Sequence, residues 1–129
     1  MTIKHGLLEQ AEAAFSHAYA PYSNFRVGAA VLTKDGHVYT GCNVENISFG
    51  LTSCAERNAI FSAIAHRGRI EIEAIAVVTE HKDGGTPCGA CRQVIHEFGP
   101  EAKIYYRQNG QEKETTTSLL LPAAFDSIT

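Results

Sequence analysis

The sequence predicts a three-layer α/β/α fold, in which helices cover both faces of a mixed five-stranded sheet. Three segments have the composition and spacing of helices, and five others are rich in strand-forming residues. These segments alternate along the chain, and strand–helix–strand connections favour parallel pairing. We therefore expect a hairpin at one side of the sheet and parallel strands in its middle.

The N-terminal half is predicted to hold one amphipathic helix followed by a hairpin. Apolar residues recur at helical spacing from Leu7 to Ala18, and the helix must end before Pro21. Residues 25–33 and 38–44 are the expected strands of the hairpin. Asp35-Gly36 lies between them and is a strong turn signal.

The C-terminal half continues with helices and strands in alternation. Residues 72–79 form a near-continuous apolar run, which is typical of a strand buried on both faces. A turn at Asn109-Gly110 separates the last two strands. The other expected elements are helices over 54–65 and 89–98, a loop over 84–87, strands over 104–107 and 112–117, and a short helical turn before Pro122.

Length and composition limit the possible classes of function. The 129 residues are predicted to form a single domain over residues 1–129, with 44% hydrophobic and 19% charged residues. A net charge of -3 provides no basic surface for a polyanion, so we expect no nucleic-acid partner. No segment has the apolar length of a membrane span and the N-terminus lacks a signal-peptide pattern, so we expect no membrane partner and a cytoplasmic location.

Three cysteines are candidate metal ligands. Cys88 and Cys91 are separated by two residues where a loop meets a predicted helix, a spacing that serves either a metal or a redox pair. Cys54 also stands at the start of a predicted helix, and three protein ligands would leave one position of a tetrahedral Zn²⁺ open for catalysis. Cys42 could be a fourth ligand, but its place within a strand favours a buried apolar role.

Two side chains next to Cys54 could complete a catalytic centre. Glu56 lies in the same first helical turn, from which its carboxylate could take a proton from water and pass it to a substrate. Three thiolates around Zn²⁺ carry a net charge of -1, which weakens the metal's effect on water. Arg57 could offset this charge by donating hydrogen bonds to the thiolates, acting behind the ligands rather than as one of them.

Four segments carry a more specific pattern: APYSNFRVGAA at 20–30, GCNVEN at 41–46, CAER at 54–57 and PCGACRQ at 87–93. In this order and spacing they resemble the small, homotetrameric, zinc-dependent cytidine deaminases. The resemblance covers nearly the whole chain and implies a cytidine deaminase-like fold, zinc on the three cysteines, proton transfer by Glu56 and a homotetramer.

The same resemblance implies a set of substrate-binding residues. Asn43 and Glu45 would bind the ribose, and Phe25 would form an aromatic wall beside the pyrimidine. The backbones of Ala55 and Thr86 would contact the edge of the base. Phe125 would reach into the site of a neighbouring subunit.

At Phe49 many members of this family have tyrosine, so a hydroxyl group near the ribose is absent here. The implied reaction converts cytidine and deoxycytidine to uridine and deoxyuridine with release of ammonia, as in pyrimidine salvage. A free nucleoside is favoured over a nucleotide, because Glu45 near the sugar would repel a phosphate. Two alternatives are a deaminase of a cytosine-containing antibiotic nucleoside and a non-catalytic zinc-binding interaction module.

Overall fold

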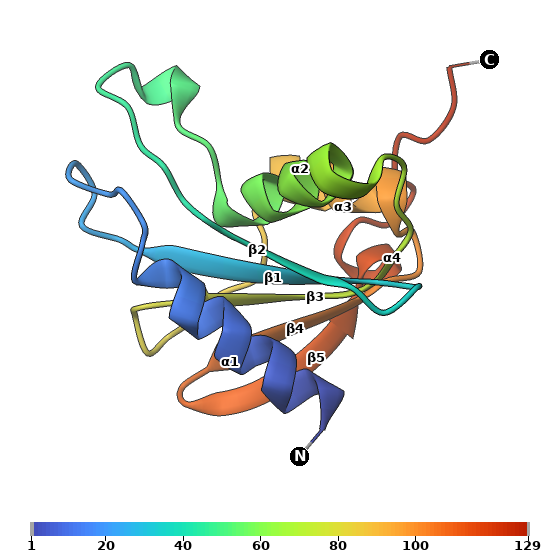
Figure 1. Cartoon of the computed structure of the whole chain (residues 1–129), viewed down its shortest axis with the longest axis horizontal. Helices are drawn as coiled ribbons and strands as arrows, with labels where there is room; N and C mark the ends of the chain where they lie inside the picture. Colours follow the sequence, from blue (N-terminus) through green and yellow to red (C-terminus); the bar gives the residue numbers. More distant parts are fainter. Residues whose placement is uncertain (1, 129) are drawn as a thin grey trace.

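The computed structural model describes residues 2–128, and its core is one five-stranded sheet with the strand order β2-β1-β3-β4-β5. Helix α1 lies across one face of the sheet, whereas α2 and α3 cover the other face (Figure 1). The predicted α/β fold with a mixed five-stranded sheet is therefore confirmed. The strands are β1 (Val27–Thr33), β2 (Val38–Cys42), β3 (Ile72–Thr79), β4 (Lys103–Gln108) and β5 (Gln111–Thr116). The helices are α1 (Ile3–Phe15), η1 (Phe49–Leu51), α2 (Ala55–Arg67), α3 (Gly89–Phe98) and α4 (Thr117–Leu120).

The sheet has the predicted hairpin at one side, β1–β2, and the predicted parallel pair toward its middle, β3–β4. Strands β3 and β4 are parallel, but β1 pairs antiparallel with both β2 and β3. The reason is the path of the β2–α2–β3 connection. It joins two strands that are parallel to each other but lie on either side of β1, so the crossover spans β1 rather than placing its strands side by side.

The two faces of the sheet bury separate clusters of apolar side chains. One cluster packs β1 and β3 against α2 and α3, and the other packs them against α1. Along β3, Ile75 belongs to the first cluster, while Ala76 and Val78 belong to the second. The prediction of a strand buried on both faces is therefore confirmed, and β3 is the central support of the molecule.

The element boundaries follow local chemistry. Helix α1 begins after Thr2, whose hydroxyl accepts a hydrogen bond from the His5 N–H as an N-cap. Strand β1 begins two residues later than predicted, because Asn24 has a φ of 55° and turns the chain just before it. The bounds of β3 and α3 agree with the prediction at both ends. No helix within residues 2–128 has the length and apolar character needed to cross a membrane.

Candidate active site and metal centre

Three thiols converge where the N-termini of α2 and α3 meet. The sulfur atoms of Cys54, Cys88 and Cys91 all lie within 4.8 Å of one another. Cys54 is the N-cap of α2 and Cys88 is the N-cap of α3, and neither side chain makes a capping hydrogen bond. The positive ends of both helix dipoles are therefore directed at the cluster, which favours thiolates.

Arg57 contributes a second positive charge to this cluster. Its Nη2 donates a hydrogen bond to Cys54 Sγ at 3.2 Å, as its predicted place beside the thiolates requires. A hydrogen bond from the Cys91 thiol, together with Arg57, lowers the pKa of Cys54 to about 5. The same contact with Cys54, followed by burial, raises the pKa of Cys91, because a thiol that donates a hydrogen bond keeps its proton more strongly.

The chemistry of these donors fits a zinc ion. Thiolates are soft ligands that select zinc over magnesium or calcium, and three of them leave a tetrahedral position free. Cys42 is not in the cluster; it is half-buried at the end of β2, and burial raises the pKa of its thiol. Among the described residues, the chain thus provides three thiol ligands and no fourth histidine or cysteine beside them.

A cavity of about 330 Å³ opens beside the thiols, and Glu56 lies in its wall. Glu56 is only 5% exposed, although it lies in the first turn of α2 and lines the cavity. Burial, reinforced by the neighbouring Cys54, raises the pKa of Glu56 to about 7. A carboxyl group with this pKa can both accept and return a proton near neutral pH.

Four of the predicted substrate-binding residues line this cavity: Phe25, Asn43, Ala55 and Thr86. Asn43 is buried, and its amide is already used in part by the backbone. Its Nδ2 donates to the Phe25 carbonyl at 2.8 Å, and its Oδ1 accepts from the Val27 N–H at 2.9 Å. One amide hydrogen and one lone pair remain. Asn43 therefore fixes the segment that carries Phe25, just before β1, and can still form hydrogen bonds with a ligand in the cavity.

The structure does not bring Glu45 and Phe125 into the same cavity. The Glu45 carboxylate accepts hydrogen bonds from the Ser23 hydroxyl and from the backbone N–H groups of Tyr22 and Ser23. These bonds lower its pKa, and the Ser23 hydroxyl has the largest effect. Phe125 is 67% exposed, and its carbonyl accepts a hydrogen bond from Gln93 at 2.7 Å. Within this chain, both residues therefore lie away from the thiols.

Two features of the site have no counterpart among the predicted residues. Gly84 and Gly85 line the cavity, and Gly84 packs so closely on the Arg107 carbonyl that an added Cβ would lie 1.7 Å from it. Arg92 donates hydrogen bonds to the Pro87 carbonyl, the Leu120 carbonyl and the Thr86 hydroxyl. The signal for Arg92 was its place directly after Cys91, from which an arginine on the first helical turn can reach back to the loop.

A larger cavity, of about 640 Å³, lies next to the first one, but the three thiols and Glu56 do not line it. It is bounded by the C-terminal part of α1, the loop after β3 and the tip of the β4–β5 hairpin, and none of the described cysteines line it. We place the candidate active site in the smaller of these two cavities, because it combines the thiols with a buried carboxyl group.

Known proteins are similar to this chain in both sequence and structure. Residues 1–107 match the family described as the cytidine and deoxycytidylate deaminase zinc-binding region. A cytidine deaminase of Halalkalibacterium halodurans is 51% identical over 121 residues, which cover 92% of this chain and 91% of that protein. The crystal structure of a cytidine deaminase from Burkholderia pseudomallei superposes with a TM-score of 0.89 at 52% identity, covering 97% of this chain and 100% of the other. A blasticidin-S deaminase of Bacillus cereus is 31% identical, with 77% of this chain and 76% of that protein covered.

Proposed function

The chain belongs to the family of zinc-binding cytidine and deoxycytidylate deaminases, and from this premise we propose that it hydrolyses free cytidine and deoxycytidine. Water replaces the amino group at C4 of the pyrimidine, so that uridine or deoxyuridine and ammonia are the products. The observation that carries this proposal is the buried carboxyl group of Glu56 beside three convergent thiols in one cavity. We assign the physiological role to pyrimidine salvage.

Zinc is the cofactor that the family and the thiol donors support. Cys54, Cys88 and Cys91 would hold it, with Arg57 balancing their negative charge. When bound, zinc supplies a Lewis acid that lowers the pKa of water toward neutral pH.

Glu56 moves the protons of the reaction. Its carboxylate takes a proton from the attacking water and delivers it to N3 of the pyrimidine, which makes C4 more electrophilic. The oxygen of water bonds to C4, and Glu56 then takes the second proton from the new C4 hydroxyl group and transfers it to the amino group. The C4–N bond breaks, a C4=O bond remains in the product, and ammonia leaves. The pKa of about 7 supports both halves of this transfer.

The remaining lining residues bind and orient the nucleoside. Phe25 lies beside the pyrimidine, and the backbones of Ala55 and Thr86 hold the edge of the base. Asn43 offers its remaining amide hydrogen and lone pair to ribose hydroxyls, and we assign Glu45 to the same sugar. Among the described residues that line the cavity, those near Phe25 include aliphatic side chains and none is a lysine or arginine, which supports a neutral nucleoside rather than a nucleotide.

We further propose a homotetramer in the cytoplasm, built from single-domain chains of residues 1–129. Large apolar side chains are exposed on the β2–α2 loop, where Ile47, Phe49 and Leu51 are 70–79% exposed. Such a concentration of apolar surface is typical of a protein interface. Phe125 would then complete the site of a neighbouring subunit. Four free cysteines agree with a reducing compartment.

A substrate panel tests the proposed reaction. The purified protein, loaded with zinc, is mixed separately with cytidine, deoxycytidine, deoxycytidine monophosphate and blasticidin S, and the ultraviolet spectrum is followed. We expect both nucleosides to be converted at a high rate and the other two compounds to be converted poorly. Efficient turnover of blasticidin S alone would assign the chain to antibiotic deamination, and comparable efficiency on the monophosphate would contradict the preference for nucleosides.

A further inference from the structure

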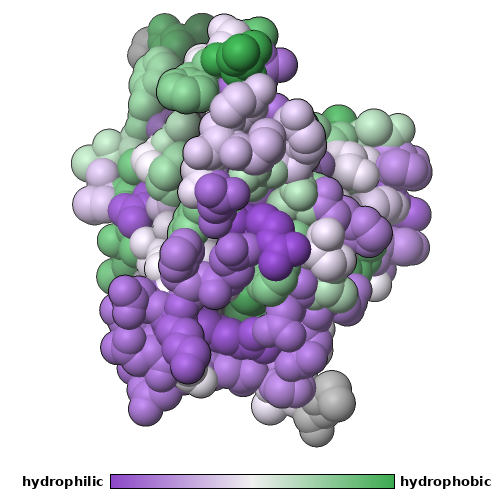
Figure 2. Space-filling view, turned by 90° about the vertical axis from the view of Figure 1, so that its left-hand side faces the viewer, coloured by the Kyte–Doolittle hydropathy of each residue, from purple (hydrophilic) through white to green (hydrophobic). Residues whose placement is uncertain are grey.

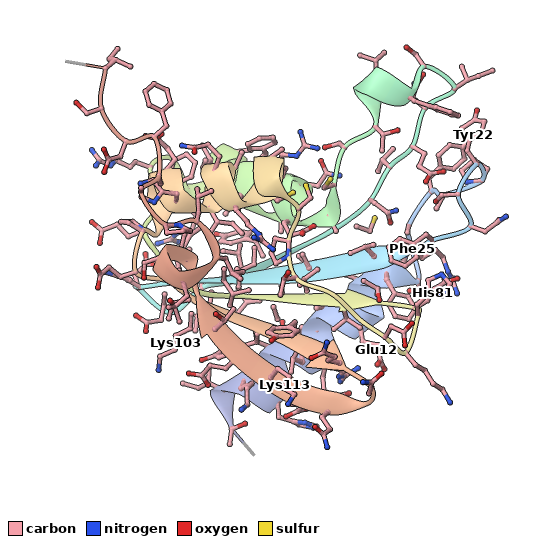
Figure 3. All side chains as sticks on the ribbon, turned by 180° about the vertical axis from the view of Figure 1, so that it is seen from behind. Glu12, Tyr22, Phe25, His81, Lys103 and Lys113 are labelled. Atoms are coloured by element: carbon pink, nitrogen blue, oxygen red, sulfur yellow. The ribbon has the colours of Figure 1, made fainter. Side chains whose placement is uncertain are left out.

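His81 stacks on the ring of Phe25 from outside the active-site cavity. The two ring centroids are 4.7 Å apart and the ring planes are inclined by 23°, which is a stacked arrangement. Phe25 lines the cavity that holds the thiols, whereas His81 lines the larger cavity next to it. Figure 3 shows the two labelled side chains together at one end of the sheet. Phe25 is therefore part of the wall between the two cavities, and His81 covers it on the solvent side.

The backbone on both sides of this contact is fixed by hydrogen bonds. The Phe25 carbonyl is held by Asn43, and its N–H donates to the Ser23 hydroxyl at 3.1 Å. The His81 carbonyl accepts from the Thr79 hydroxyl at 3.1 Å and from the Gly84 N–H at 3.0 Å. The backbone of the loop that carries His81 and the backbone of the segment that carries Phe25 are thus each held in place by hydrogen bonds.

These two segments are also joined directly to each other. The Glu80 N–H donates to the Arg26 carbonyl at 3.1 Å, and the side chains of the same two residues form an ion pair. The turn that begins at His81 then leads to Gly84, which lines the active-site cavity. His81 consequently lies at the point where the aromatic wall and the glycine loop of the cavity meet.

The ring of Phe25, unlike its backbone, has no hydrogen bond to fix its orientation. A half-exposed phenylalanine in a segment outside the sheet can rotate about two side-chain torsions unless other groups pack against it. Among the described residues, His81 supplies the one aromatic ring that stacks on Phe25. Removing this ring would leave the wall of the cavity mobile, and a substrate would then have to order it on binding.

We propose that His81 is a positioning residue for substrate binding: its imidazole ring stacks on Phe25 and holds that ring as the fixed wall against which the pyrimidine packs. This inference rests on the proposed function, since it requires a pyrimidine nucleoside in the cavity. His81 is exposed and lies outside the cavity lining, so its role is to orient Phe25 rather than to transfer protons to the substrate.

The test compares three substitutions of His81 with respect to KM and kcat. His81→Ala is expected to raise the KM for cytidine roughly 2- to 10-fold, the range that an aromatic pair contributes, and to leave kcat within about twofold. His81→Phe keeps a stacking ring and is expected to restore KM. His81→Leu keeps apolar bulk without the ring and is expected to remain weak. His17→Ala is the matched control, because His17 is an exposed histidine in a turn and is not among the residues that line the cavity.

A second readout does not depend on turnover. The dissociation constant of the product uridine, measured by calorimetry, is expected to rise in His81→Ala by the same factor as KM, while zinc content and melting temperature match the wild type. Normal wild-type turnover with an unchanged KM in His81→Ala would overturn the positioning role alone. Equal rescue by Leu and Phe, or a fall in kcat without a change in KM, would also overturn it. A zinc-loaded wild type that does not deaminate cytidine would instead reject the proposed function, and this proposal with it.

Discussion

Glu56 occupies a place that is unfavourable for a charged side chain and useful for proton transfer. A glutamate in the first turn of a helix is usually exposed, where it interacts with the helix dipole. Here the side chain is 5% exposed and faces the cavity, so burial brings its pKa to about 7. The cost of burying the carboxyl group is consistent with a functional role, because an alanine or leucine would pack there more favourably.

Arg57 provides a prediction about the charge of the thiol cluster. Arg57→Ala removes the hydrogen bond to Cys54, so the thiolates would donate more negative charge to a bound zinc ion. The zinc ion would then be a weaker Lewis acid and would lower the pKa of its water less. We expect kcat for cytidine to fall about 10- to 100-fold while one zinc ion per chain is retained. The measurements are steady-state kinetics and metal analysis on the same preparation.

Arg69→Ala serves as the control for Arg57→Ala, because Arg69 is exposed and lies outside the thiol cluster. It should keep the wild-type kcat. Unchanged turnover in Arg57→Ala, or loss of the metal from it, would contradict the assignment of Arg57 to charge balance.

Much of the site was predictable at the scale of single residues, because a motif fixes chemistry at short range. Cys54, Cys88 and Cys91 were predicted to meet, and the structure brings their sulfur atoms together. The place of Glu45 could not be read from strand alternation, since its carboxylate binds the turn at Tyr22 and Ser23. That contact depends on how two loops distant in sequence fold against each other.

The layers of the fold come unusually close together at two glycines. A Cβ added at Gly28 in β1 would lie 1.9 Å from the Ala11 carbonyl oxygen of α1. A Cβ added at Gly41 in β2 would lie 2.4 Å from the Ala59 backbone nitrogen of α2. Both contacts involve backbone atoms, which cannot rotate away as a side chain can. The helices thus pack directly against the sheet. This packing fixes the N-terminus of α2, where Cys54 and Glu56 line the cavity.

Two glycine substitutions test this close packing. Gly28→Ala should lower the free energy of unfolding by about 3 kcal/mol or more, because α1 must move away from β1. Gly6→Ala is the matched control within α1, since no atom lies within 4 Å of its added Cβ. It should raise the free energy of unfolding by roughly 0.5–1 kcal/mol through its better helix propensity. Urea denaturation of the metal-loaded protein measures both, and equal midpoints for the two variants would contradict the account.

The elements themselves were more predictable than their pairing. The apolar run of β3 and the glycine that ends α3 fixed the bounds of these elements in advance. The antiparallel pairing of β1 with β3 was not predictable from the alternation of strands and helices, because a crossover can pass over an intervening strand. The short helix η1 was also missed, since three residues are too few to show a period.

The surface of the whole molecule is unevenly divided between polar and apolar regions. Figure 2 shows hydrophobic colour gathered along the top of one face, where the β2–α2 loop lies, above a predominantly hydrophilic lower half. Phe49 and Leu51 in this loop are 73% and 70% exposed. Tyr22 lies beside Phe49 with ring centroids 6.0 Å apart, so the apolar surface extends to a second loop. A surface of this kind is suited to bury itself against another copy of the chain.

Assembly is therefore the prediction that belongs to the molecule as a whole. We expect the zinc-loaded protein to sediment at four times the mass of one chain. Phe49→Ser combined with Leu51→Ser should lower that mass, because it removes apolar area from the proposed interface. Ile3→Ser is the control, since Ile3 is also exposed but lies at the start of α1. A wild type that remains monomeric at micromolar concentration would contradict the homotetramer.

The most direct test of the central claim is the ultraviolet spectrum of cytidine mixed with the wild type and with Glu56→Gln. The substitution keeps the size of the side chain and removes its ability to carry a proton, so zinc content should stay the same in both proteins. The account predicts that the cytosine spectrum is replaced by that of uracil with the wild type, and that the rate falls by at least about 100-fold with Glu56→Gln. Equal rates for two proteins that both hold zinc would contradict the role of Glu56. A stable cytosine spectrum with the zinc-loaded wild type would contradict the proposed deamination itself.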